Sequence, residues 1–234
     1  MKLRTYGLFF KALFMGLLFI GLLGLPSCGG EGLDSDALYI LSEVNKGDDS
    51  YIPPSDVTSA TFVATSMDIL SNSVTDATVT VKNANAPYFM IGYITQGTPA
   101  ISEGEDVDIT VVRGENTVTA TLPMPEKPVI TSPADDSWHD ANSQINVQWT
   151  LSTTPDLIFF EIEKSYTVSG EDYTAQLAGT ATSHSIPAGT LRASINGIEI
   201  NVYSVNMTSD FTGTIITGSI YATSHVTQIE IHTN

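Results

Sequence analysis

The chain has 234 residues, 42% of them hydrophobic, and a formal net charge of −17 at pH 7. This length and apolar content allow one or two packed domains and argue against wholesale disorder. This negative charge repels the phosphates of nucleic acid and of anionic lipid headgroups, so neither is an expected partner.

The amino-terminal segment has the three regions of a secretory signal peptide. Residues 1–4 are basic, and residues 8–25 are apolar apart from Lys11 and several glycines. A basic start followed by a short apolar run is typical of a signal that is cleaved. Beyond Lys11 the apolar run ends at Leu25, short of the ~20 residues that span a bilayer. We therefore expect residues 1–27 to be a removed signal peptide.

The residues Leu25-Pro26-Ser27-Cys28 resemble the lipobox of bacterial lipoproteins, in which a leucine precedes two small residues and a cysteine. The resemblance implies a diacylglyceryl group on the Cys28 thiol, cleavage before Cys28 and acylation of its new amine. More than one acyl chain gives a stable anchor, at about 0.8 kcal/mol per buried CH₂. Gly29, where some family members carry an aspartate that retains them at the inner membrane, implies delivery to the outer membrane.

Cys28 is the only cysteine, so no disulfide within the chain is expected. The signal region contains three of the nine basic residues and no acidic residue. The mature chain would therefore carry six basic against 26 acidic residues, a charge near −20. A charge of this size favours solubility, or a cation as a partner.

Proline and glycine divide the mature chain into segments. Residues 28–36 are rich in glycine and acids and predict a flexible tether. The sequence Pro123-Met124-Pro125-Glu126-Lys127-Pro128 predicts a stiff, extended linker over residues 124–127. We therefore expect a first domain at 37–123 and a second domain at 128–234.

The first domain reads as a series of short strands, with no helical period after residue 35. Val107, Ile109 and Val111 alternate with polar residues, and so does the run 117–122 that follows a glycine-containing turn at 113–116. This pattern predicts a β-hairpin. Short strands without helices favour a sandwich, and the domain resembles immunoglobulin-like or transthyretin-like modules.

The second domain alternates more clearly. Ile145, Val147, Trp149 and Leu151 are expected to face the core. In the next strand, the expected inward set is Ile158, Phe160 and Ile162, which leaves Glu161 and Glu163 outside. Further strands are expected at 173–177, 198–207 and 219–232, with a turn at 194–197.

Several segments of this domain together resemble a fibronectin type III domain, which carries a tryptophan on its second strand and an aromatic-rich strand late in the chain. They are Pro128–Pro133, Ile145–Trp149, Phe160–Lys164, Ser185–Leu191 and Ile200–Asn206. The expected fold class is therefore all-β: two β-sandwich (immunoglobulin-like) domains in tandem after a cleaved signal peptide.

Acidic residues supply the main candidates for a cation site. Glu103, Glu105, Asp106 and Asp108 form the densest cluster, and Ca²⁺ prefers six to eight oxygen ligands. Acids at the start of a strand also protect a sheet edge, which is the alternative role. The pairs 48–49 and 135–136 are weaker versions of the same pattern.

Among the four histidines, His232 shares a strand face with Glu230, two residues before it. Such a pair at the edge of a sheet is usually solvated surface. A metal site requires further ligands that converge on the same point.

Two tryptophans are present, and the patterns around them differ. Trp149 belongs to an alternating strand and is expected in the core. Trp138 lies in a polar loop, where it either packs under the first turn of the domain or offers a flat surface to a ligand such as a glycan.

No catalytic motif is present: there is no Gly-x-Ser-x-Gly, His-Glu-x-x-His, P-loop or dinucleotide-binding pattern. We therefore expect a non-catalytic, lipid-anchored envelope protein that presents β-sandwich modules for a structural or binding role, with a protein or a glycan as partner. The alternative is a glycan- or Ca²⁺-binding module that assists an envelope enzyme or transporter.

Overall fold

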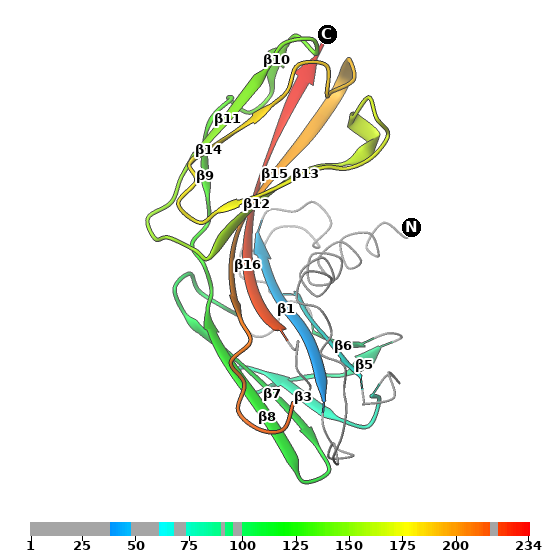
Figure 1. Ribbon diagram of the computed structural model, residues 1–234, viewed down its shortest axis with the longest axis vertical. Coiled ribbons are helices and arrows are strands. Elements are labelled where there is room, and N and C mark those ends of the chain that lie inside the picture. The colour runs from blue at the N-terminus through cyan, green and yellow to red at the C-terminus, as the bar shows by residue number, and fades with distance from the viewer. Residues whose placement is uncertain (1–37, 48–60, 68–73, 90–91, 96–99, 216–219) are drawn as a thin grey trace, which may run out of the picture. The chain divides into compact units, whose positions relative to one another are not determined.

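The computed structural model describes residues 38–47, 61–67, 74–89, 92–95, 100–215 and 220–234 (Figure 1). The expected signal peptide (1–27), the lipidation residue Cys28 and the tether (28–36) lie outside these ranges. The described residues form strands and one short 3-10 helix, η1 (Lys164–Tyr166), so the expected all-β class is confirmed. In this part of the chain, no helix has the length and apolar content to cross a membrane.

The described residues divide between two compact units. Unit 1 holds those of Met1–Asn45, Ser50–Pro123 and Met207–Thr223, and unit 2 holds those of Lys46–Asp49, Met124–Asn206 and Ser224–Asn234. The expected second domain at 128–234 therefore differs from unit 2, because Met207–Thr223 belongs to unit 1. The reason is the length of strands β15 (Ser194–Thr208) and β16 (Ile220–Thr233), which each supply residues to both units. Unit 2 also includes the expected linker at 124–127 and Lys46–Asp49 from the expected first domain at 37–123.

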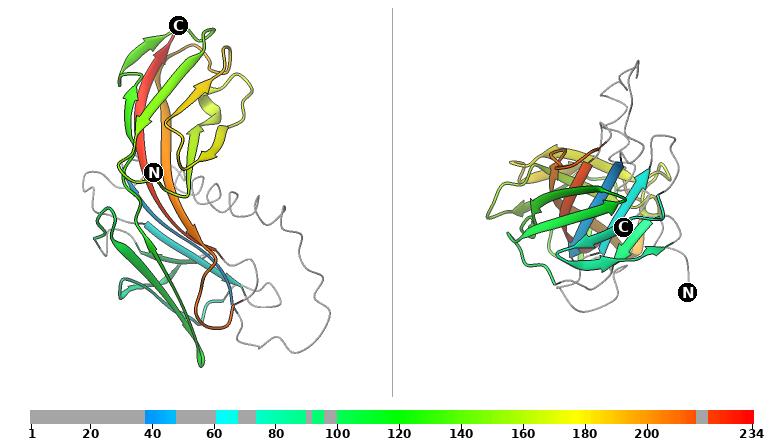
Figure 2. Two further views of the ribbon diagram at one scale, coloured as in Figure 1. Left: turned by 60° about the vertical axis from the view of Figure 1, so that its left-hand side comes forward. Right: turned by 90° about the horizontal axis from the view of Figure 1, so that it is seen from below.

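Unit 2 contains two sheets. One has three strands in the order β14-β11-β9. The other is the part of a nine-stranded sheet that has the order β13-β12-β15-β16. Their bounds are β9 (Val129–Ser132), β11 (Ile145–Thr150), β12 (Leu157–Ile162), β13 (Tyr173–Ala178) and β14 (Ser183–Ile186). Figure 2 shows β15 and β16 running side by side. A short strand, β10 (Ser137–His139), pairs in parallel with the end of β16.

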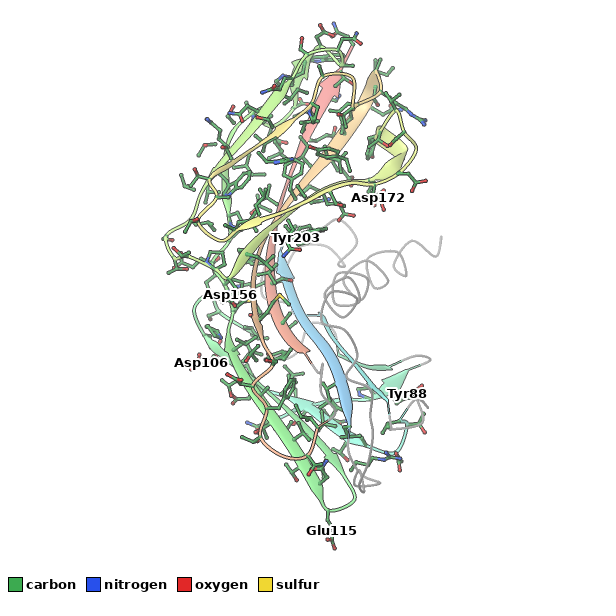
Figure 3. The ribbon with its side chains drawn as sticks, viewed as in Figure 1. Tyr88, Asp106, Glu115, Asp156, Asp172 and Tyr203 are labelled. Atoms are coloured by element: carbon green, nitrogen blue, oxygen red, sulfur yellow. The ribbon has the colours of Figure 1, made fainter. Side chains whose placement is uncertain are left out.

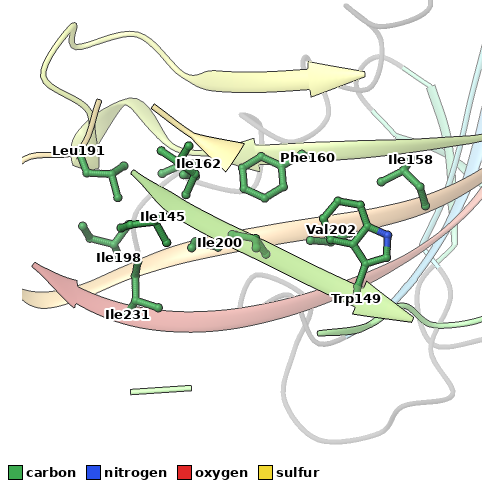
Figure 4. Packing of buried hydrophobic residues seen from close by; sticks show 12 residues of the cluster. Ile145, Trp149, Ile158, Phe160, Ile162, Leu191, Ile198, Ile200, Val202 and Ile231 are labelled. Atoms are coloured by element: carbon green, nitrogen blue, oxygen red, sulfur yellow. The ribbon is translucent and has the colours of Figure 1, made fainter. Parts of the chain in front are cut away.

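The inner faces of these two sheets form the core of unit 2 (Figure 4). Burial alternates strictly along β11, so Ile145, Val147 and Trp149 face inward as predicted. The Trp149 Nε1–H donates a hydrogen bond of 2.8 Å to the carbonyl oxygen of Ala181. The other members of the core come from the strands that face β11: Ile158, Phe160, Ile162, Ile198, Ile200, Val202 and Ile231, with Ile186 and Leu191 closing it. Two sheets that enclose one apolar layer make unit 2 an immunoglobulin-like β-sandwich.

Glu161 corrects one prediction for β12. The alternating pattern predicted an outward, solvated side chain, but Glu161 is only 2% exposed. The Tyr203 hydroxyl, on the neighbouring strand β15, donates a hydrogen bond of 3.3 Å to its Oε2. Both faces of β12 are therefore covered, and alternation reveals only which residues share a face, not whether that face meets water.

The start of β15 corrects another prediction. The residues Ser194–Gly197 were expected to form a turn, but they are the first four residues of this strand. The Ser194 N–H donates a hydrogen bond of 3.0 Å to Thr233 Oγ1, so the end of β16 fixes this segment. The extended conformation is thus decided by a residue far away in the chain.

Unit 1 also consists of short strands. One sheet has the order β4-β3-β7-β8. The strands β1, β2, β6 and β5 follow β16, in that order, in the nine-stranded sheet. Their bounds are β1 (Tyr39–Gly47), β2 (Thr61–Met67), β3 (Thr78–Val81), β4 (Ala84–Ala86), β5 (Tyr88–Phe89), β6 (Gly92–Thr95), β7 (Asp106–Arg113) and β8 (Asn116–Pro123).

The predicted hairpin of unit 1 is confirmed as β7–β8, with Arg113 opposite Asn116. Gly114 has a φ of 58°, the left-handed conformation that a tight hairpin turn requires. Glu115 lies at the tip (Figure 3). The inward residues of β7 are fully buried, and the Tyr221 hydroxyl donates a hydrogen bond of 2.9 Å to the Val107 carbonyl. Burial is the main cause that raises the pKa of Tyr221, and the Asp108 charge adds to it.

The core of unit 2 gives a first prediction. Replacing Trp149 by alanine removes the largest fully buried side chain and leaves a cavity. The free energy of unfolding should fall by about 3–5 kcal/mol, as measured by denaturant titration. The control is Gln148→Thr, an exposed neighbour on β11, which should change it by less than about 0.5 kcal/mol. Equal effects of the two substitutions would contradict this account of the core.

Candidate functional site

The strongest candidate site lies at the end of β16 in unit 2, beside β10 (Figure 1). In the parallel pairing of these strands, Trp138 is opposite His232. The two rings stack with centroids 4.9 Å apart and planes inclined by 27°. Even so, Trp138 remains 58% exposed, so it does not pack beneath the first turn of the domain. Of the two roles open for this residue, the structure excludes the buried one.

Two carboxylates lie beside the His232 ring. Asp136 Oδ1 lies 2.6 Å from His232 Nε2, and Glu230 Oε1 lies 3.9 Å from the same nitrogen. The ligand atoms of Asp136, Glu230 and His232 all lie within 4.8 Å of one another. We call these three residues and Trp138 the β16-end site.

Backbone contacts fix the two carboxylate residues against each other. The Asp136 N–H donates a hydrogen bond of 2.7 Å to the Glu230 carbonyl oxygen, and the Glu230 N–H donates one of 2.8 Å to Asp135 Oδ1. Asp136 has a φ of 63°, a conformation that aspartate and asparagine tolerate better than most residues. The turn before β10 therefore places Asp136 beside the β16 strand.

Gly197 on β15 makes room for the Glu230 side chain. A Cβ atom on Gly197 would lie 1.7 Å from Glu230 Cδ, far inside van der Waals contact. The absence of a side chain at residue 197 thus lets the carboxylate of Glu230 lie over β15. The site is assembled from the turn before β10, from β10, from β16 and from this opening on β15.

The electrostatics of the site favour a charged imidazole. The hydrogen bond from His232 to Asp136 is the main cause that raises the pKa of His232. Burial opposes this shift, while the charges of Asp136 and Glu230 and the Ile195 backbone add to it. Elsewhere in unit 2, burial lowers the pKa of His184, whose Nε2 lies 2.9 Å from the Tyr173 hydroxyl.

The acidic cluster at 103–108 belongs to unit 1 and is arranged differently. Glu105 forms an ion pair with Lys82, and its second oxygen accepts a hydrogen bond of 2.8 Å from the Ser102 N–H. Asp108 accepts one of 2.8 Å from the Thr121 hydroxyl. In the part of the chain that the structure describes, the group of potential metal ligands that converges is the one in the β16-end site, without Glu103, Glu105, Asp106 or Asp108. Calcium binding by these four acids stays a prediction.

The sequence contained only part of the signal for the β16-end site. The spacing of Glu230 and His232 predicts that they share a strand face, and the acidic pair 135–136 is a weak pattern for a cation-binding loop. Nothing in the spacing showed that Asp136 meets His232 across 96 residues. That contact depends on the parallel pairing of β10 with β16.

The two histidines give a prediction with an internal control. In an NMR pH titration, His232 should titrate above 6.5 and His184 below 6.5. A raised pKa means that the His232–Asp136 pair stabilises the fold below pH 6.5, and that this is lost as pH rises through the folded pKa. For His184 the pH dependence of stability is opposite. Because its pKa is lowered in the fold, the folded state loses stability as pH falls below 6.5.

The substitution Asp136→Asn tests the cause of the His232 shift. It removes the carboxylate, so the pKa of His232 should fall while that of His184 stays unchanged. A His232 midpoint at or below 6.5 in the unsubstituted protein would contradict the hydrogen-bonded geometry.

Comparison with known proteins found no family model and no curated protein that matches the chain. Among solved structures, it is similar to the crystal structure of the FN1–FN3 domains of chicken CNTN1, with 10% sequence identity and a TM-score of 0.28. The match covers 84% of this chain but only 66% of that structure's length. The immunoglobulin-like sandwich follows from the strand order and the core of unit 2, not from this likeness.

Proposed function

We propose that this chain is a lipid-anchored, non-catalytic protein of the bacterial cell envelope that presents its β-sandwich units for a structural or binding role. The lipobox-like residues 25–28 support an anchor on Cys28, and Gly29 supports the outer membrane as its place. The mature charge near −20 disfavours nucleic acid as a partner and leaves a protein or a glycan.

The exposed ring of Trp138 is the observation that carries the binding role. Tryptophan is a large side chain, and aromatic rings dominate the energetics of interfaces. Trp138 is held in place by strand pairing and by stacking on His232, yet more than half of it is exposed. A ring that is already fixed loses little conformational entropy when a partner covers it.

The anchor can be tested by mass spectrometry of the membrane fraction. We expect an acylated peptide that begins at Cys28, because two or more acyl chains hold a protein stably in a bilayer. The substitution Cys28→Ala should abolish both the acylation and the cleavage. A mature chain that is soluble and unmodified would refute the anchor while leaving the β16-end site untouched.

Glycan binding is a second candidate function, favoured by the pairing of an aromatic face with carboxylates. The apolar face of a sugar ring stacks on indole, while its hydroxyls donate hydrogen bonds to acceptors such as Asp136 and Glu230. A protein partner would cover the same Trp138 ring but would make different polar contacts around the edge of the interface.

A glycan array distinguishes these partners. If a glycan binds, Trp138→Ala should weaken its affinity by at least about tenfold, the effect of losing about 1.4 kcal/mol at an interface hot spot. The control is Val168→Ala, since Val168 is a similarly exposed apolar residue of unit 2, at 59%. An array on which no signal depends on Trp138 would exclude the glycan candidate and leave a protein partner.

A further inference from the structure

The three donors of the β16-end site form an arrangement that a metal ion would complete. We propose that Asp136, Glu230 and His232 bind a divalent transition-metal cation of the Zn²⁺ class. This site goes beyond the proposed function and does not depend on the lipid anchor or on a glycan. Its donors are one imidazole nitrogen and two carboxylate oxygens within 4.8 Å of one another.

The distances suit a small tetrahedral ion after slight adjustment. Zinc binds nitrogen and oxygen at about 2.0–2.2 Å, which places neighbouring tetrahedral ligands ~3.4 Å apart. The distances from His232 Nε2 are 2.6 Å to Asp136 and 3.9 Å to Glu230, one shorter and one longer than this separation. The Asp136 and Glu230 side chains are 81% and 50% exposed, so a rotation brings either one into place.

The remaining contacts hold the His232 ring and the backbones of the two carboxylate residues in position before a cation arrives. His232 is only 12% exposed and is fixed by its stack against Trp138. The hydrogen bond between the Asp136 N–H and the Glu230 carbonyl fixes the separation of the two backbones. Gly197 leaves the space that the Glu230 side chain occupies. A preorganised set of donors loses less entropy when it binds a ligand.

The charge of the site also favours a cation. The carboxylate oxygens of Asp136 and Glu230 lie within 4.8 Å of each other. A third carboxylate, that of Asp135, accepts a hydrogen bond from the Glu230 N–H. The negative charges of these carboxylates repel one another. A divalent cation bound between them would replace this repulsion with attraction. A divalent ion adds two positive charges to the site, whereas a proton on His232 adds one.

The donor set selects the class of metal. An imidazole nitrogen suits zinc, copper and nickel, whereas Ca²⁺ takes six to eight oxygen ligands. Three protein ligands leave a fourth position open for water or for a donor atom from a partner. Trp138 stacks on the ring of His232 and so lies next to this donor set.

Isothermal titration of the purified, chelator-treated protein with ZnCl₂ at pH 8 tests the site. Single substitutions His232→Gln, Glu230→Gln and Asp136→Asn should each weaken the zinc affinity by at least about tenfold, because each removes one of three ligands. All three positions are at least partly exposed, and asparagine tolerates the positive φ of residue 136, so the variants should fold. Zinc should also raise the melting temperature of the unsubstituted protein, but not that of His232→Gln.

The matched control is Asp140→Asn. Asp140 is an exposed carboxylate of the loop that follows β10, and it accepts a hydrogen bond of 2.8 Å from the Asn142 N–H, which an asparagine oxygen can also accept. Like Asp136→Asn, this control removes one negative charge near the site, but it removes no ligand. The zinc affinity of Asp140→Asn should therefore change less than twofold. Equal weakening by Asp140→Asn and Asp136→Asn would show a general charge effect and overturn the proposal. Undiminished zinc binding by His232→Gln, or Ca²⁺ binding as tight as that of Zn²⁺, would overturn it as well.

Discussion

Burial of the apolar face of β11 against the opposing sheet is the interaction on which unit 2 depends. Trp149 belongs to this core, and its one polar atom, Nε1, donates a hydrogen bond to the Ala181 carbonyl oxygen. A buried N–H without a partner would cost about 1–3 kcal/mol, so this bond is what allows so large a side chain to be buried whole. With the two sheets locked together, the strands β15 and β16 have fixed positions, and the edge of β16 becomes a defined surface.

The candidate site follows from how that edge is covered. An exposed strand edge offers unpaired backbone groups, and proteins cover or charge such edges. Here β10 does both, because it pairs with Ile231–Thr233 and brings Asp136 and Trp138 with it. The result is an aromatic ring and several carboxylates gathered at one end of unit 2. A feature that protects the fold thus also concentrates the chemistry suited to a ligand or a cation.

Much of the fold could be predicted because side chains on a strand alternate with a period of two. The inward faces of β7 and β11, and the hairpin at Gly114, required only local pattern and turn chemistry. The misses share one cause. Glu161 is buried because the second face of β12 is also covered. Strand β15 begins in unit 2 and ends in unit 1. Neither fact leaves a mark in the local pattern.

The all-β class, the core residues around Trp149 and the lipobox-like segment at Cys28 can be read from the sequence, because each depends on residues close together in the chain. The contact of Asp136 with His232, 96 residues away, and the exposure of Trp138 emerge in the folded chain. Strand pairing joins segments without regard to their separation in sequence, so no local pattern reveals this contact. The parallel pairing that places Trp138 on His232 also adds β10 to the sheet beside β16, so it is part of both the site and the fold.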